Sequence, residues 1–167
     1  MKFLKPSDIL SGNTFSYLEV FNVTDGLALG TKENGVLYYI EDLYCMNPSC
    51  KCNDVVLIYT ENKEIESEKG AHYAVRLSLK KKNFEILDTN GVTKKEVEDL
   101  IKNSMKNNNE TIEFYKKLYL EMKEAGKKVL HGGNSDDNNI TESSQKTLKE
   151  QLRELQSSSI IWIIEVV

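Results

Sequence analysis

The sequence is poor in the residues and segments that mark several protein classes. Its 167 residues include two prolines, nine glycines and only three cysteines, all three between positions 45 and 52. An odd number of clustered cysteines excludes the disulfide framework of a small secreted protein. No segment approaches the roughly 18 apolar residues of a membrane-spanning helix, and the first residues lack the apolar stretch of a signal peptide. We therefore expect a cytoplasmic protein without a membrane span.

The chain also lacks an excess of positive charge. It has 22 Lys and Arg residues against 26 Asp and Glu residues, which gives a formal net charge of −4. A basic surface of the kind that attracts nucleic acid would therefore have to be local, and nucleic acid is a disfavoured partner. Only Arg76 and Arg153 among the basic residues are arginines. This bias is typical of an AT-rich coding sequence, so runs of Lys and Asn carry little functional information.

The first half of the chain has the pattern of an antiparallel sheet. Short segments rich in Val, Ile, Leu, Tyr and Phe alternate with turn residues, including the pairs Asp25-Gly26 and Asn34-Gly35. The simplest arrangement is a meander of five to six strands. The expected strands cover residues 14–23, 27–29, 36–44, 55–60, 73–79 and 84–87.

Helical spacing replaces this pattern after about residue 90. Thr93 and Glu96 have the spacing of a capping box, and apolar residues follow every three to four positions, which predicts a helix over 93–106. A second helix is expected from about residue 112 until Gly126, which is interpreted as its terminating residue. A weaker helical pattern covers 141–156. The apolar run 160–167 is interpreted as a last strand of the sheet, a segment that pairs with a partner chain, or an altered end.

These elements predict an α+β fold with a cysteine loop between two strands, two packed helices, and a C-terminal helix and tail. Residues 1–130 form the expected domain, with a candidate zinc loop at 44–53. The Gly-, Asn- and Asp-rich segment 131–140 is expected to be a flexible linker, and 141–167 the C-terminal helix and apolar tail. The tail is a candidate surface for a protein partner or for self-association.

The cysteine cluster is the strongest chemical signal in the chain. Cys45, Cys50 and Cys52 follow one another in a short segment with a turn signal at Asn47-Pro48. Zinc binds thiolates at tetrahedral corners, and a tight turn brings such ligands together. Zinc is therefore the expected cofactor. Free or redox-active thiols and a structural disulfide remain the alternatives.

The same segment carries a local resemblance. The residues from Tyr44 to Cys52 read Tyr-Cys-x-Asn-Pro-x-Cys-x-Cys ahead of the apolar strand 55–59. This block resembles one found in uncharacterised bacterial proteins, and it covers about fifteen residues of the chain. The resemblance implies a metal site at the three cysteines and no particular activity.

The sequence does not identify the fourth ligand of such a site. His131 is one candidate, because the second helix could bring it back across the sheet. His72 is another, although a hairpin that places Thr60 near Tyr73 puts it on the order of 26 Å from the cysteines at about 3.3 Å per strand residue. The carboxylates of Asp42 or Asp54, a water molecule and a second chain are the remaining candidates.

Other charged residues fit ordinary surface positions. The same hairpin places the turn lysines beside Lys51 and the cysteine loop, where they could contact an anion or a nucleic acid; these are Lys80, Lys81 and Lys82. A polar hairpin tip explains them equally well. Glu41-Asp42 is interpreted as solvated surface at the polar end of a strand.

Three functions are consistent with this pattern. We favour a non-enzymatic accessory module in which zinc stabilises a loop that binds a protein partner. A zinc enzyme with an open fourth coordination position is the first alternative, although thiolate ligands make zinc a weak Lewis acid and no general base is evident. A zinc knuckle that binds nucleic acid is the second.

Overall fold

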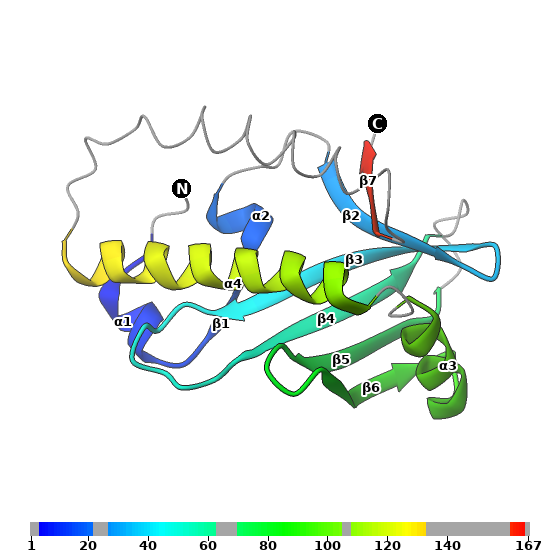
Figure 1. Cartoon of the computed structure of the whole chain (residues 1–167). Helices are drawn as coiled ribbons and strands as arrows, with labels where there is room; N and C mark the ends of the chain where they lie inside the picture. Colours follow the sequence, from blue (N-terminus) through cyan, green and yellow to red (C-terminus); the bar gives the residue numbers. More distant parts are fainter. Residues whose placement is uncertain (1–3, 22–26, 63–69, 105–107, 133–160, 166–167) are drawn as a thin grey trace.

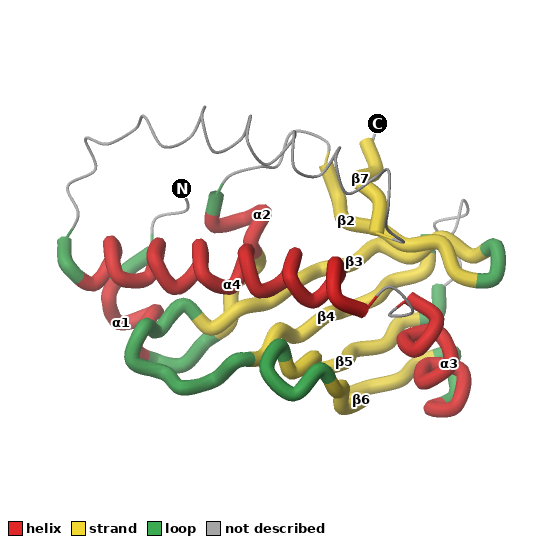
Figure 2. The backbone as a smooth tube through the Cα atoms, viewed as in Figure 1, coloured by secondary structure: helices red, strands yellow, loops and turns green. Residues whose placement is uncertain are grey.

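The computed structural model has the expected α+β architecture, in which helices lie against one antiparallel sheet (Figure 1). It describes residues 4–21, 27–62, 70–104, 108–132 and 161–165. The long helix α4, Asn108–Leu130, runs across one face of the sheet, and Figure 2 shows its red tube over the yellow strands. None of the helices in these segments is long and apolar enough to cross a membrane.

The sheet has the strand order β6-β5-β4-β3-β2-β7, and a short strand β1 also pairs with β3. All of these pairings are antiparallel. Strands β2 to β6 therefore form the meander that the sequence predicts. The strand bounds are β1 Thr14–Ser16, β2 Leu27–Glu33, β3 Val36–Cys45, β4 Asp54–Glu61, β5 His72–Ser78, β6 Asn83–Asn90 and β7 Ile161–Glu165.

The strand predicted over residues 14–23 forms only at its start, where β1 covers Thr14–Ser16. Residues Tyr17–Val20 form a short helix, α2, in place of the strand predicted over 14–23. Tyr17 and Val20 are both buried, and their spacing of three places them on one side of a helical turn. A second short helix, α1 (Pro6–Leu10), precedes β1.

One predicted turn and the predicted last strand are confirmed. Asn34 and Gly35 have φ values of 52° and 86°, the paired positive angles of a tight turn between β2 and β3. The last strand completes the sheet, since β7 pairs with β2. The Asp25-Gly26 turn, the linker beyond Gly132 and the helix predicted over 141–156 lie outside the described residues.

The capping box also forms as expected. Helix α3 spans Lys94–Ser104, and the Glu96 carboxylate accepts hydrogen bonds from the backbone N–H and the hydroxyl of Thr93, each at 2.7 Å. Glu96 N–H in turn donates to the Thr93 hydroxyl at 3.3 Å. These bonds satisfy backbone groups that the first helical turn leaves unpaired.

Gly126 does not end the second helix as expected. Helix α4 continues through it to Leu130, and the chain takes a left-handed conformation only at Gly132, where φ is 65°. Gly126 is buried and faces the loop after β3, where a Cβ atom would lie 1.9 Å from the carbonyl oxygen of Met46. The residue therefore permits a close approach between helix and loop.

The core lies between α4 and the sheet. Along β3 every second residue is buried, from Tyr38 to Tyr44, and the apolar face of α4 packs on the same cluster. Alternation in a strand and three- to four-residue spacing in a helix give each element one buried face. The α4 members include Ile112, Tyr115, Leu118, Tyr119, Met122 and Ala125.

Candidate metal centre

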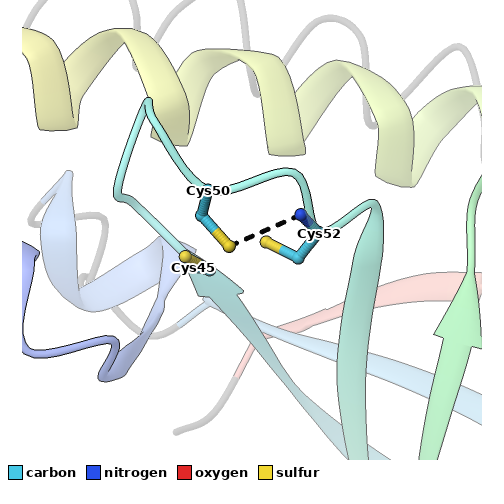
Figure 3. Close-up of side chains that lie close together, drawn as sticks. All are labelled: Cys45, Cys50 and Cys52. Carbon is cyan, nitrogen blue, oxygen red and sulfur yellow. Dashed lines mark hydrogen bonds between the residues drawn. The ribbon is translucent and has the colours of Figure 1, made fainter.

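The three cysteines lie at and after the end of β3, in the loop that leads to β4 (Figure 3). Cys45 is the last residue of β3, and the turn that follows is organised by Asn47. Its side-chain oxygen accepts the N–H of Ser49 at 2.9 Å, and its backbone carbonyl accepts the N–H of Cys50 at 3.1 Å. The predicted Asn-Pro turn therefore folds the chain back and returns Cys50 toward Cys45.

The turn brings the three sulfur atoms within 4.8 Å of one another, which is close enough to hold a metal ion. The backbone N–H of Cys52 also points to the sulfur of Cys50 at 3.4 Å, the dashed line in Figure 3. Cys50 is exposed, whereas Cys45 and Cys52 are half-buried, and all three are free thiols. The cluster is thus local in sequence, contains no disulfide in this structure, and is open to solvent on one side.

Helix α4 closes the other side of the cluster. It passes beside the loop in Figure 3, and the hydroxyl of Tyr119 donates a hydrogen bond to the carbonyl oxygen of Cys52. The same hydroxyl lies 4.0 Å from the Cys52 sulfur. About two helical turns further on, Gly126 meets Met46. A long helix therefore fixes both arms of a loop that would otherwise be held only at its ends.

Lys123 is the site residue that the sequence did not reveal. Its ammonium nitrogen lies 3.6 Å from the sulfur of Cys45 and 3.6 Å from that of Cys52, and it donates a hydrogen bond to the carbonyl oxygen of Asn47 at 2.6 Å. The side chain is 9% exposed. The only sequence signal for it is a lysine between Tyr119 and Gly126 on the buried face of α4.

The thiols differ in their electrostatic surroundings. Burial is the main reason why the pKa of Cys52 rises to about 11, and hydrogen bonds with the other two thiols add to the rise. The hydrogen bond from the Cys52 backbone lowers the pKa of Cys50. In the metal-free protein Cys50 is therefore the most exposed of the three thiols. It also ionises more readily than Cys52.

We expect Cys50 to react first with an alkylating reagent. Limiting iodoacetamide added to metal-free, reduced protein should give one label per chain, located on Cys50 by peptide mass mapping, before Cys45 or Cys52 is modified. The reason is that the thiolate is the nucleophile and that only Cys50 is exposed. In the control Cys50→Ser, labelling of the remaining thiols should be slow. First labelling of Cys52 would contradict this arrangement.

The structure does not bring the predicted fourth ligands to the cysteines. Among the described residues, no His, Asp or Glu belongs to the group of ligating atoms that contains the three sulfurs. His131 is exposed at the end of α4, two turns beyond Lys123. His72 pairs with Thr60 at the far end of β4 and β5, one residue from the predicted register, and its ring lies 3.8 Å from Asp88. A metal role for His131 thus stays a prediction without a contact that supports it.

The interpretation of Glu41-Asp42 as solvated surface is wrong for the second residue. Glu41 is exposed, but Asp42 is 1% exposed, because alternate residues of β3 face α4. One oxygen of Asp42 accepts the hydroxyl hydrogen bond of Tyr44 at 2.8 Å. Burial raises the pKa of Asp42 to about 7, although the bond from Tyr44 opposes the rise. Asp42 is therefore a buried titratable group in the core and not a metal ligand.

Four lysines lie at or next to the cysteine loop, as expected: Lys51 within it, and Lys80, Lys81 and Lys82 in the turn between β5 and β6. The N–H of Leu79 donates to the carbonyl oxygen of Asn53 at 2.8 Å, which places the β5–β6 turn beside the end of the cysteine loop. The four lysines are exposed, and the Lys82 ammonium donates to the Asn109 side chain at 2.8 Å. A role in binding anions or nucleic acid stays a prediction for Lys51, Lys80, Lys81 and Lys82.

Comparison with known proteins gives no relative from which a function could be inferred: no family model, curated protein or solved structure matches the chain.

Proposed function

We propose that this protein is a non-enzymatic, zinc-stabilised accessory module. In this role, Cys45, Cys50 and Cys52 hold one zinc ion, and the metal fixes the loop between β3 and β4 as a surface for a protein partner. The observation that carries the proposal is the mutual approach of the three sulfurs to within 4.8 Å. No other described side chains of metal-binding type form such a group.

Zinc is the metal that these ligands suit best. Thiolates favour soft or borderline ions, and zinc in cysteine-rich sites has a structural role without redox chemistry. The site also has the outer contacts that such centres need. N–H groups from Cys52 and Lys123 point to the sulfurs, and Tyr119 fixes the backbone at Cys52. These contacts would orient the thiolates and stabilise their charge.

The position of the loop favours a binding role. Cys50 and its neighbours Ser49 and Lys51 are exposed, while the opposite side of the loop is packed on α4. A bound ion would therefore rigidify an exposed segment on a well-packed base. A rigid loop loses less conformational entropy when a partner binds than a flexible one does.

Catalysis at an open coordination position is the second candidate. It is favoured by the lack of a fourth His, Asp or Glu in the cluster within the described segments. The groups nearest the sulfurs are the Tyr119 hydroxyl and the Lys123 ammonium. Burial and the neighbouring Cys52 charge raise the pKa of Tyr119 far above its usual range, so it does not supply a base at neutral pH. The structural role is therefore the stronger candidate.

The deciding experiment is native mass spectrometry of the reduced full chain, combined with thermal unfolding with and without zinc. We expect one zinc ion per chain. At a free zinc concentration 100-fold above the dissociation constant, binding should stabilise the fold by about 2.7 kcal/mol. Treatment with a chelator should lower the melting temperature to that of the metal-free protein.

Cys50→Ser is the matched variant for this test. Cys50 is exposed, so the exchange should leave the metal-free melting temperature unchanged while zinc no longer raises it. Ser49→Ala, at the exposed neighbouring position, should bind zinc like the parent protein. Less than roughly half an equivalent of zinc in the reduced parent protein would refute the proposal.

A further inference from the structure

The groups around the Lys123 ammonium stabilise a positive charge. Its nitrogen donates to the Asn47 carbonyl oxygen at 2.6 Å and lies 3.6 Å from two sulfurs. It also lies 5.1 Å from the centre of the Tyr119 ring, within the range of a cation–π contact. A carbonyl oxygen, two sulfurs and an aromatic face are all partners that stabilise an ammonium.

This ammonium is nearly buried, so its charge needs a counter-charge. The described salt bridges on α4 join other residues at its exposed surface, Lys116 with Glu113 and Lys127 with Glu124. No carboxylate joins the group of ligating atoms around the three sulfurs in the described segments. The sulfurs of Cys45 and Cys52 contact Lys123, and they become negatively charged when a bound metal ion displaces their protons. A buried charge that loses its partner is strongly destabilising.

We propose that Lys123 selects the charge of the ion that the three cysteines bind, favouring divalent soft ions over trivalent ones. The inference rests on the proposed metal centre. Three thiolates and a divalent ion have a net charge of −1, which the Lys123 ammonium neutralises. Three thiolates and a trivalent metalloid such as arsenic(III) are already neutral, so the buried ammonium would be left without a counter-charge. A monovalent ion would leave one negative charge in excess.

The position of Lys123 makes this effect large. The nitrogen contacts Cys45 and Cys52 at the same distance, so it lies close to any ion that these two sulfurs share. Charges at such separations interact strongly when water is excluded, and the helix side of the site is the buried one. Lys51, which also neighbours the cysteines in sequence, is exposed and thus screened by solvent.

The test compares zinc and arsenite binding in the reduced full chain. Zinc affinity is measured by competition with a chromophoric chelator, and arsenite affinity by the absorbance of the arsenic–thiolate bonds. In Lys123→Met we expect zinc affinity to fall by at least about tenfold, a typical effect for groups that contact metal ligands. Arsenite affinity should stay the same or rise. The zinc-to-arsenite preference is the readout, because a general loosening of the site weakens both.

Lys123→Arg and Lys127→Met complete the design. Arginine keeps the charge but does not coordinate a metal, so it should retain the preference, and the exposed Lys127 should have no effect. Lys123→Gln, which keeps a donor for Asn47, replaces Lys123→Met if that variant does not fold. Equal loss of zinc affinity in Lys123→Arg and Lys123→Met would overturn the proposal and identify the amine as a ligand. An unchanged preference in Lys123→Met would also overturn it. Failure of the parent protein to bind either ion would instead refute the metal centre.

Discussion

Replacing Gly126 with alanine is expected to destabilise the protein by roughly 1–3 kcal/mol, the cost typical of an overpacked contact. The added Cβ would lie 1.9 Å from the carbonyl oxygen of Met46 and 3.2 Å from its Cβ. One contact is with backbone, so rotation of a side chain cannot relieve it. Ordinarily the same exchange inside a helix stabilises it by about 1 kcal/mol. The predicted sign is therefore opposite to the one that helix propensity gives.

The measurement is urea unfolding of the metal-free protein. Lys128→Ala is the control, because Lys128 is exposed in the same turn of α4 and should change the unfolding free energy little. Gly126→Ala should also weaken zinc binding, since moving α4 away from the loop separates Lys123 from the sulfurs of Cys45 and Cys52. A Gly126→Ala protein as stable as the parent would show that α4 and the loop are not in close contact.

The parts of the fold that follow from local patterns were predictable. Alternating apolar residues gave strands β2 to β6, and the capping pair Thr93–Glu96 gave the start of α3. Asn34-Gly35 gave a tight turn because both residues tolerate positive φ. The helix at Tyr17–Val20 was missed because its four residues are too few to show a helical period.

The candidate site also has a part that follows from local sequence and a part that depends on the packing of distant segments. The three cysteines and the Asn47 turn lie within eight residues, so their spacing alone predicts a cluster. Lys123 and Gly126 come from α4, more than 70 residues later in the chain. Whether such residues face a loop depends on how the helix packs on the sheet, which is a non-local property. The same reason explains why the prediction for Gly126 was wrong. A glycine after a helical pattern is typical of a helix end, but here it lies inside α4 and permits a close contact with Met46.

The burial of Asp42 makes stability depend on pH in a defined window. Burial is the largest cause of its pKa of about 7, against 3.8 for a free side chain, and the exposed charge of Glu41 adds to the rise. The folded state therefore holds a proton on Asp42 between about pH 4 and 7, where the unfolded chain has released it. Unfolding free energy should fall as pH rises through this range and level off above it.

Asp42→Asn is expected to remove most of this dependence. At about 1.36 kcal/mol per pKa unit, the parent protein should lose roughly 3 kcal/mol between pH 5 and pH 8 from this group, and Asp42→Asn should lose little. Asparagine retains an acceptor for the Tyr44 hydroxyl and carries no charge to desolvate.

The measurement is urea unfolding at both pH values, with chelator present so that metal binding does not contribute. Glu41→Gln is the matched control: it is adjacent in sequence, exposed, and should leave the difference between the two pH values nearly unchanged. Both variants remove one carboxylate, so only burial distinguishes them. Equal pH dependence in Asp42→Asn and the parent protein would mean that Asp42 ionises freely in the folded state. The contact between β3 and α4 would then be more open to water than the core packing indicates.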